Sequence, residues 1–234
     1  MIFQKIRHLF LFFIPFIFSL HAEKPNIIFV LADDLGWAEL GCYGNTFNET
    51  PNLDKLAKQG VRFTHAYAAA PVCSPYRAAL LTGQHPARVG ILDYLRPNSS
   101  NALPVDQVTL PKILKRNGYA TGMVGKWHLT GYKYQGAQFE IRPQDHGFDW
   151  NIGSEVKGVG NGANFWPNVF RTQPISWIDL PKNRMGKDEY LTDRLNLEAV
   201  DFVECNKGKP FFLYLSHYAP HTILNGRPDL VNKY

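Results

Sequence analysis

Apolar residues gather in short runs along the chain, and these runs predict the strands of a sheet. Residues 26–32 and 210–216 are continuous apolar stretches of strand length. Runs without polar alternation are typical of strands covered on both faces, as in a parallel sheet between layers of helices. We also expect strands at 61–68 and 119–124.

Helical segments alternate with these strands, at residues 50–60, 74–83, 109–117 and 188–205. The last is the most clearly amphipathic, because its apolar residues recur on one face. Such alternation predicts an α/β fold in which a mostly parallel sheet is sandwiched between helices. The stretch 145–187 has no strong period, and we expect it to form a loop-rich rim around the site.

The first 22 residues have the pattern of a secretory signal. A short basic start with Lys5 and Arg7 precedes an almost pure apolar run, residues 9–20, and the segment ends at Ala22. The run is too short for a comfortable membrane span, so we expect cleavage after Ala22 and no stable span afterwards. The alternative is an uncleaved N-terminal anchor. We expect export, to the periplasm or the exterior of a bacterium, or to lysosomes or the medium in a eukaryote.

Composition and charge then narrow the class of function. The net charge of +5 falls to +3 once the first 22 residues are removed, because Lys5 and Arg7 lie there. A charge this mild argues against nucleic acid as a partner and is compatible with an anionic substrate. Three cysteines, Cys42, Cys73 and Cys205, leave at least one thiol unpaired in an exported chain, and their spacing suggests no zinc site.

The segment that begins at Cys73 carries the most chemistry. Cys73 would lie at the N-terminus of the helix over 74–83, where free amides and the helix dipole favour an anion. Arg77 follows one turn later and can point its guanidinium at the same place. The pattern therefore predicts an anion pocket built around a nucleophile. The alternative is an ordinary buried cysteine followed by an exposed arginine.

Polar residues also follow the predicted strands, where ligands of parallel sheets bind. Asp33 and Asp34 form an adjacent acidic pair whose hard oxygens suit Ca²⁺ or Mg²⁺, with a solvated acidic turn as the alternative. Lys126 and His128 are two residues apart, so on an extended backbone they would share one face. His221 follows the last predicted strand.

The ordered set of motifs resembles the type I sulfatases of the alkaline phosphatase superfamily. Cys73-x-Pro-x-Arg77 is followed by Ala-x-Leu-x-Thr-Gly, and Gly-Lys126-Trp-His128-Leu and Ala-Pro-His221-Thr come later in the expected order. The resemblance extends from Lys24 to the end of the chain. Tyr76 departs from the small residue more often found at its position, and we expect it to shape the pocket.

The resemblance implies that a formylglycine-generating enzyme oxidises Cys73 to Cα-formylglycine. It implies a Ca²⁺ or Mg²⁺ ion, with Asp33, Asp34 and residue 73 among its ligands. The hydrated aldehyde would attack sulfur, and Arg77 and Lys126 would stabilise the sulfate oxygens. The same resemblance assigns two proton transfers to histidines: His221 would assist the departing alcohol, and His128 would take a proton in the release of sulfate.

The function expected is therefore hydrolysis of a sulfate monoester, on a sulfated small molecule or a sulfated polysaccharide. One alternative is a phosphate or phosphonate ester hydrolase of the same superfamily, and another is a non-catalytic polyanion-binding protein with Cys73 unoxidised. The resemblance places further metal ligands and a second lysine downstream of His221. We therefore expect residues 23–234 to be the N-terminal portion of the catalytic domain, apparently truncated, with little or no activity alone.

Overall fold

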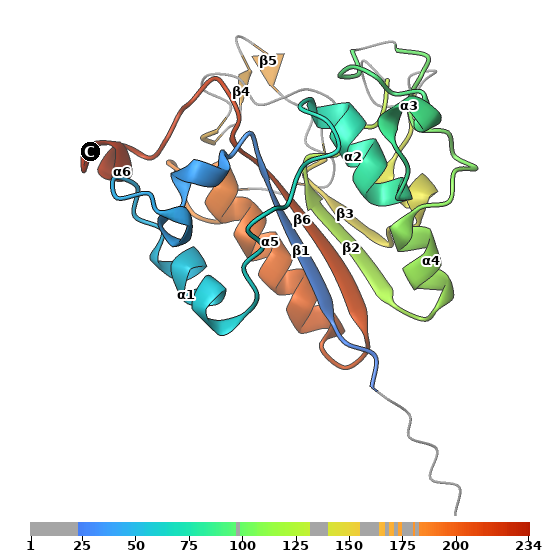
Figure 1. Cartoon of the computed structure of the whole chain (residues 1–234), viewed down its shortest axis with the longest axis horizontal. Coiled ribbons are helices and arrows are strands. Elements are labelled where there is room, and N and C mark those ends of the chain that lie inside the picture. The colour runs from blue at the N-terminus through green and yellow to red at the C-terminus, as the bar shows by residue number, and fades with distance from the viewer. Residues whose placement is uncertain are drawn as a thin grey trace, which may run out of the picture.

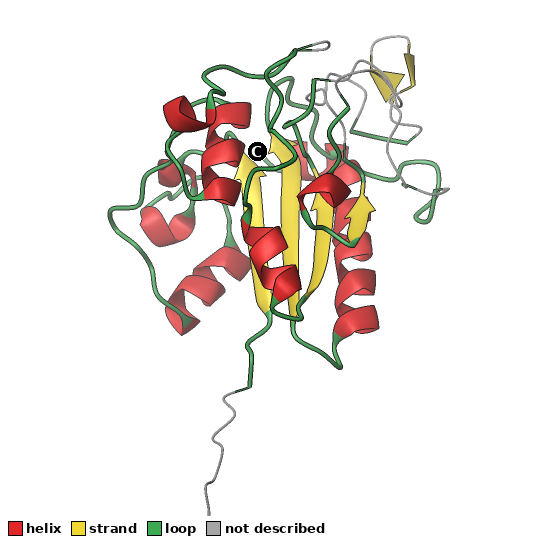
Figure 2. Ribbon diagram, turned by 90° about the vertical axis from the view of Figure 1, so that its right-hand side faces the viewer, coloured by secondary structure: helices red, strands yellow, loops and turns green. Residues whose placement is uncertain are grey.

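The computed structural model shows a parallel sheet with helices on both faces (Figures 1 and 2). It describes residues 23–96, 99–131, 140–154, 164–166, 169–170, 173–174, 180 and 183–234. The proposed signal over residues 1–22 lies outside this part of the chain. Within the described ranges, every helix is too short or too polar to cross a membrane.

The main sheet has four strands in the order β1-β6-β2-β3, and all three pairings are parallel. The bounds are Ile27–Asp33 for β1, Phe211–Pro220 for β6, Ala120–Gly125 for β2 and Trp150–Ile152 for β3. The strands predicted at 26–32, 119–124 and 210–216 are confirmed as β1, β2 and β6. β3 lies where we expected loop, because three residues are too few to show a period.

Helices cover both faces of this sheet, as the α/β prediction required. α2 (Cys73–Thr82) and α4 (Leu110–Arg116) cover one face, where the core includes Phe148, Phe212 and Tyr214. α5 (Leu191–Asn206) covers the other and buries Leu195 and Phe202. The remaining elements are η1 (Trp37–Glu39), η2 (Gly41–Tyr43), α1 (Pro51–Gln59), α3 (Pro86–Val89), η3 (Pro143–His146), β4 (Val169–Phe170), β5 (Gln173–Pro174) and α6 (Pro228–Val231).

The prediction that the first strand is covered on both faces is wrong. Ile27, Phe29 and Leu31 pack against the core, but Ile28 and Val30 are 53% and 59% exposed. β1 is an edge strand of the described sheet, and α5 packs on β6 and β2, further into the sheet. An apolar run therefore marked a strand here without determining whether its second face would be covered.

The strand predicted over 61–68 is also wrong. These residues run as irregular chain, with Val61 81% exposed and Tyr67 86% exposed. A strand needs a neighbour for its backbone groups, and the main sheet passes directly from β1 to β6. β-Propensity reflects the fit to a pleated, half-buried surface, so without such a surface the residues do not form a strand.

Candidate active site

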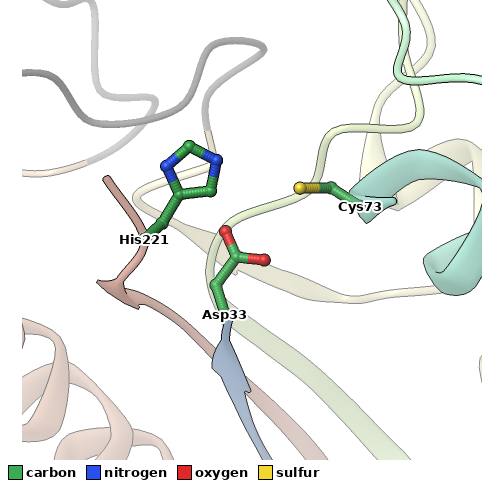
Figure 3. A group of neighbouring side chains, drawn as sticks. All are labelled: Asp33, Cys73 and His221. Carbon is green, nitrogen blue, oxygen red and sulfur yellow. The ribbon is translucent and has the colours of Figure 1, made fainter. Parts of the chain in front are cut away.

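The carboxyl ends of three parallel strands bring the predicted residues together. Asp33 ends β1, Lys126 follows β2, and His221 follows β6. Cys73 approaches from the side as the first residue of α2. One ligand atom each from Asp33, Cys73 and His221 lies within 4.8 Å of the others, and Figure 3 shows the three side chains converging.

Cys73 lies where the sequence placed it, at the positive end of a helix. Val72 precedes it in extended conformation and makes no side-chain cap to the first turn. The helix end therefore offers its partial positive charge to an anion beside the sulfur. Cys73 is half-buried and its thiol is free, as are the thiols of Cys42 and Cys205.

Asp33 is buried between two cations. Its Oδ1 lies 3.2 Å from Nη2 of Arg77, and its Oδ2 accepts a hydrogen bond from Nζ of Lys126. Burial by itself would raise the pKa of Asp33, but Lys126 and Arg77 lower that pKa below its ordinary value. Asp33 is therefore an anion held in place within a cationic surrounding.

Arg77 is fully buried and turned toward the protein, so the alternative of an exposed arginine is wrong. Its Nη1 donates to the Lys126 carbonyl at 2.9 Å, to the Tyr214 hydroxyl at 3.3 Å and to Ser216 Oγ. Burial opposes its charge, but Tyr214 and Asp33 raise the pKa of Arg77 above its ordinary value. The guanidinium thus fixes Asp33 and the end of β6 from behind the pocket.

Tyr214 and Ser216 were missed from the sequence. They occupy alternate positions of β6, and both face Arg77. The available signal was the period-2 alternation of a strand that carries a hydroxyl at its C-terminal end. We missed this signal because we interpreted residues 210–216 as entirely apolar.

Lys126 reaches the site because the chain turns sharply after β2. Gly125 has φ of 101°, and a Cβ there would lie 2.0 Å from the Ser216 carbonyl oxygen, so only glycine fits. The Nζ of Lys126 then lies 3.4 Å from Sγ of Cys73. A buried ammonium group therefore sits against the proposed nucleophile and the carboxylate of Asp33.

His128 does not follow the extended backbone expected for residues 126–128, because its φ is 55°, in the left-handed region. Its Nε2 lies 3.1 Å from the Leu95 carbonyl, and its buried Nδ1 has no hydrogen-bond partner among the described residues. Burial, with Lys126 and Arg77 nearby, lowers the pKa of His128 to about 3. The ring is therefore neutral at physiological pH.

His221 lies close to the Cys73 sulfur. A hydrogen bond with the Cys73 side chain raises the pKa of His221 above its ordinary value, while burial and Lys126 act in the other direction. Its Nε2 also lies 3.7 Å from Oδ2 of Asp34. The pKa values of His221 and His128 are thus shifted in opposite directions, mainly by the hydrogen bond with Cys73 at His221 and by burial at His128.

Asp34 approaches the group formed by Asp33, Cys73 and His221 through His221, and it is more exposed than its neighbour Asp33. Its backbone is left-handed, with φ of 67°, and its side chain is 51% exposed. It nevertheless lines the same pocket of about 310 Å³, together with Asp33, Cys73 and Tyr76. The acidic pair is therefore split, with one carboxylate buried under the sulfur and the other at the pocket's open side.

Comparison with known proteins identifies the family of this chain. The Sulfatase family model matches residues 25–234. Human steryl-sulfatase is 33% identical over 297 residues, which cover 98% of this chain and 51% of that protein. The chain spans about half the length of the curated relatives it matches.

Solved structures give the same result. The structure of Ps i-CgsB in complex with k-i-k-neocarrahexaose has 35% sequence identity and a TM-score of 0.75, over 91% of this chain and 49% of that one. BT4656, in complex with its substrate D-glucosamine-2-N,6-O-disulfate, has 32% identity and a TM-score of 0.68, over 90% and 38%. The chain therefore belongs to the sulfatase family, within the alkaline phosphatase superfamily.

Proposed function

We propose that this chain provides the catalytic centre of a sulfuric ester hydrolase that cleaves sulfate monoesters. The observation that carries the proposal is the convergence of Asp33, Cys73 and His221, with Lys126 against the sulfur. Membership of the sulfatase family supports the class of reaction. The assignment of individual residues is our inference from their positions.

The nucleophile would arise at position 73. We propose that a formylglycine-generating enzyme oxidises Cys73, so that Sγ marks the place of the oxygens of a hydrated aldehyde. Such a residue supplies an oxygen nucleophile and can shed sulfate by returning to the aldehyde, whereas an ordinary serine would remain trapped as its sulfate ester. The free thiol and its place at the N-terminus of α2 support this role.

Asp33 and Asp34 fit the ligand preferences of Ca²⁺ or Mg²⁺. Both ions favour carboxylate oxygens, and oxidation of Cys73 would replace a soft sulfur with oxygen at the third proposed ligand. Asp33 offers a buried carboxylate within 4.8 Å of the Cys73 and His221 ligand atoms, and Asp34 lines the same pocket. A bound dication would supply electrostatic stabilisation of the negative charge that develops on the reacting oxygens.

Lys126 and Arg77 would bias the pocket toward an anion. The two cations flank one buried carboxylate, Asp33, which leaves excess positive charge beside position 73. Lys126 would contact the sulfate oxygens directly, because its Nζ is already 3.4 Å from the Cys73 sulfur. Arg77 would act from behind by holding Asp33. Preorganised charges of this kind stabilise a transition state without reorganising during the reaction.

The two histidines would divide the proton transfers. His221 would donate to the alcohol oxygen while the bond from sulfur to that oxygen breaks. His128 would then take the proton of the second hydroxyl of residue 73 while the bond from carbon to the sulfate oxygen breaks, restoring the aldehyde, which water rehydrates. The unpartnered Nδ1 of His128 is an acceptor suited to this step.

The substrate would be a sulfated small molecule or a sulfated polysaccharide. The names of related proteins support a sulfated small molecule or a sulfated saccharide, since one relative is a steryl-sulfatase, BT4656 has a disulfated glucosamine as its substrate, and Ps i-CgsB was solved with k-i-k-neocarrahexaose. We further propose that residues 1–22 direct export, as the basic start and apolar run indicate. Both proposals concern the whole enzyme.

The decisive experiment is mass spectrometry of the peptide that contains Cys73, after co-expression with a formylglycine-generating enzyme. We expect an aldehyde that reacts with a hydrazide, and we expect Arg77→Ala to prevent its formation. The variant Cys205→Ser is a matched control that should leave conversion unchanged, because Cys205 is an exposed thiol on α5. Detection of only unmodified thiol would reject the mechanism and leave the polyanion-binding alternative.

Rates on an aryl sulfate and an aryl phosphate, measured side by side with the complete enzyme, separate the proposed function from its nearest rival. We expect the sulfate to be the better substrate. Faster hydrolysis of the phosphate would reassign the enzyme to phosphate or phosphonate esters on the same scaffold.

A further inference from the structure

Ser74 follows Cys73 in α2, and its hydroxyl connects two distant segments. Its Oγ donates to the His128 carbonyl at 2.7 Å and accepts the Leu95 N–H at 3.0 Å. The residue is fully buried. Serine in a helix usually bonds to a neighbouring turn of its own chain, so a hydroxyl used for two remote segments is a specific arrangement.

Leu95 connects Ser74 to the imidazole of His128. While its N–H is held by Ser74, its carbonyl lies 3.1 Å from Nε2 of His128. A carbonyl can only accept, so this contact requires the proton on Nε2 and leaves Nδ1 of a neutral ring as an acceptor. The buried Nδ1 has no partner in the described part of the chain. The contact with the Leu95 carbonyl therefore selects the tautomer of His128 that carries its proton on Nε2.

The backbone of His128 also needs support. Its φ of 55° is left-handed, a conformation that is unfavourable for a residue with a Cβ. The bond from Ser74 holds the carbonyl of that residue in the orientation this conformation demands. The Ser74 hydroxyl thus restrains the backbone of His128. It also holds the Leu95 backbone, whose carbonyl contacts the His128 imidazole.

We propose that Ser74 is a positioning residue, which keeps His128 in its left-handed conformation with the proton on Nε2 and the lone pair of Nδ1 free. The structure thereby couples the helix that carries position 73 to the histidine assigned to the second proton transfer. The purpose of the free lone pair rests on the proposed function. The placement itself does not.

The test is the tautomer of His128, read from the ¹⁵N chemical shifts of its ring in the whole chain by nuclear magnetic resonance. We expect the Nε2–H form in the parent chain and a mixture with the Nδ1–H form in Ser74→Ala. If Ser74→Ala does not fold, Ser74→Cys provides the test, because a thiol of similar size is a weak hydrogen-bonding group. A parent-like signal for His128 in the folded variant would overturn the proposal.

Thr109→Val is a matched control, because Thr109 makes the same kind of contact at another histidine. Its buried hydroxyl donates to the His146 carbonyl at 2.9 Å, and Nε2 of His146 lies 3.3 Å from the Leu103 carbonyl. We expect this control to lose stability while the His128 signal stays unchanged. An equal change of the His128 signal in both variants would show a general loosening of the fold and reject the specific role.

Kinetics of the complete enzyme provide the second readout. Once conversion of position 73 has been verified by mass, Ser74→Ala should lower kcat about tenfold or more with little change in KM. An unchanged kcat would reject the role in turnover. If the parent enzyme itself does not hydrolyse sulfate esters, the proposed function fails, and the ¹⁵N measurement still decides whether Ser74 places His128.

Discussion

Nη2 of Arg77 lies 3.2 Å from Oδ1 of Asp33, and both side chains are nearly inaccessible, at 1% and 7% exposure. The pair joins α2 to the end of β1, 44 residues apart in the sequence. Lys126 shares the same carboxylate. The ion pair therefore holds together two of the elements that form the pocket, and its loss would affect stability as well as chemistry.

We predict that Arg77→Met lowers the free energy of unfolding by about 3–5 kcal/mol, because a buried carboxylate loses one of its two cations. Urea unfolding followed by circular dichroism measures this change. Arg96→Met is the control, since Arg96 pairs with Asp93 at 3.1 Å but both side chains are more than half exposed. That exposed pair should contribute little to stability. Similar losses in the two variants would contradict the structural role of Arg77.

In the complete enzyme, His128→Ala should stop the cycle after the first transfer. Sulfate would stay attached to residue 73, because the proton of the second hydroxyl has no acceptor, and turnover should fall by about 10²–10⁴-fold. Intact-protein mass spectrometry after mixing with an aryl sulfate detects the added mass. His65→Ala should behave like the parent, because His65 is exposed and outside the pocket. Failure to find the adduct would remove the assigned role of His128.

His221→Ala should slow esters of poor leaving groups and largely spare activated aryl sulfates. A good leaving group departs as an anion and needs no proton, whereas an alkyl alcohol does. The measurement is kcat/KM across a series of sulfates that differ in the pKa of the alcohol, which should show a steeper dependence in the variant. Parallel losses across the series would show that His221 is not the proton donor.

Acid should destabilise the chain through its buried histidines. Burial and nearby Lys112 lower the pKa of His146 to about 4, against opposing effects of the Leu103 carbonyl and Asp145. The unfolded chain therefore binds the extra proton between about pH 6.5 and 4, and the free energy of unfolding falls as pH falls through that window. We expect His146→Gln to reduce the slope near pH 5 by about 1 kcal/mol per pH unit. An unchanged slope would contradict a neutral, buried His146.

The exposed face of β1 should promote self-association of the isolated chain. Ile28 and Val30 lie half-exposed on an edge strand of the described sheet, which leaves apolar surface and backbone groups open to a second molecule. We expect Val30→Lys to shift the chain toward the monomer in size-exclusion chromatography with light scattering. Val108→Lys makes the same charge change at a site 50% exposed and should have little effect. Association unaffected by Val30→Lys would place the contact elsewhere.

The sequence alone located three of the four strands of the main sheet and the end of the sheet where the site lies. Apolar runs located β1 and β6, and the strand β2 was predicted after the helix over 109–117, because local patterns of apolar residues reflect the secondary structure that carries them. Parallel strands deliver their carboxyl ends to one edge, so Asp33, Lys126 and His221 could be placed there without coordinates. The position of Cys73 at a helix N-terminus followed from similarly local signals.

Tertiary structure decided which surfaces are covered. One face of β1 is exposed although its sequence is apolar throughout, and residues 61–68 form no strand. Both outcomes arise because burial and strand pairing require partners from elsewhere in the chain. An apolar sequence shows that a segment can be buried, and only packing against other segments determines whether it is buried.

Tertiary structure also decided the roles of the polar groups in the pocket. Arg77 turns to Asp33 and Ser216, His128 adopts a left-handed backbone, and Ser74 connects that backbone to Leu95. The partners in these contacts are 21 to 139 residues apart. A hydrogen bond depends on distance and direction in space, which spacing along the sequence does not specify once the chain has left one element and entered another.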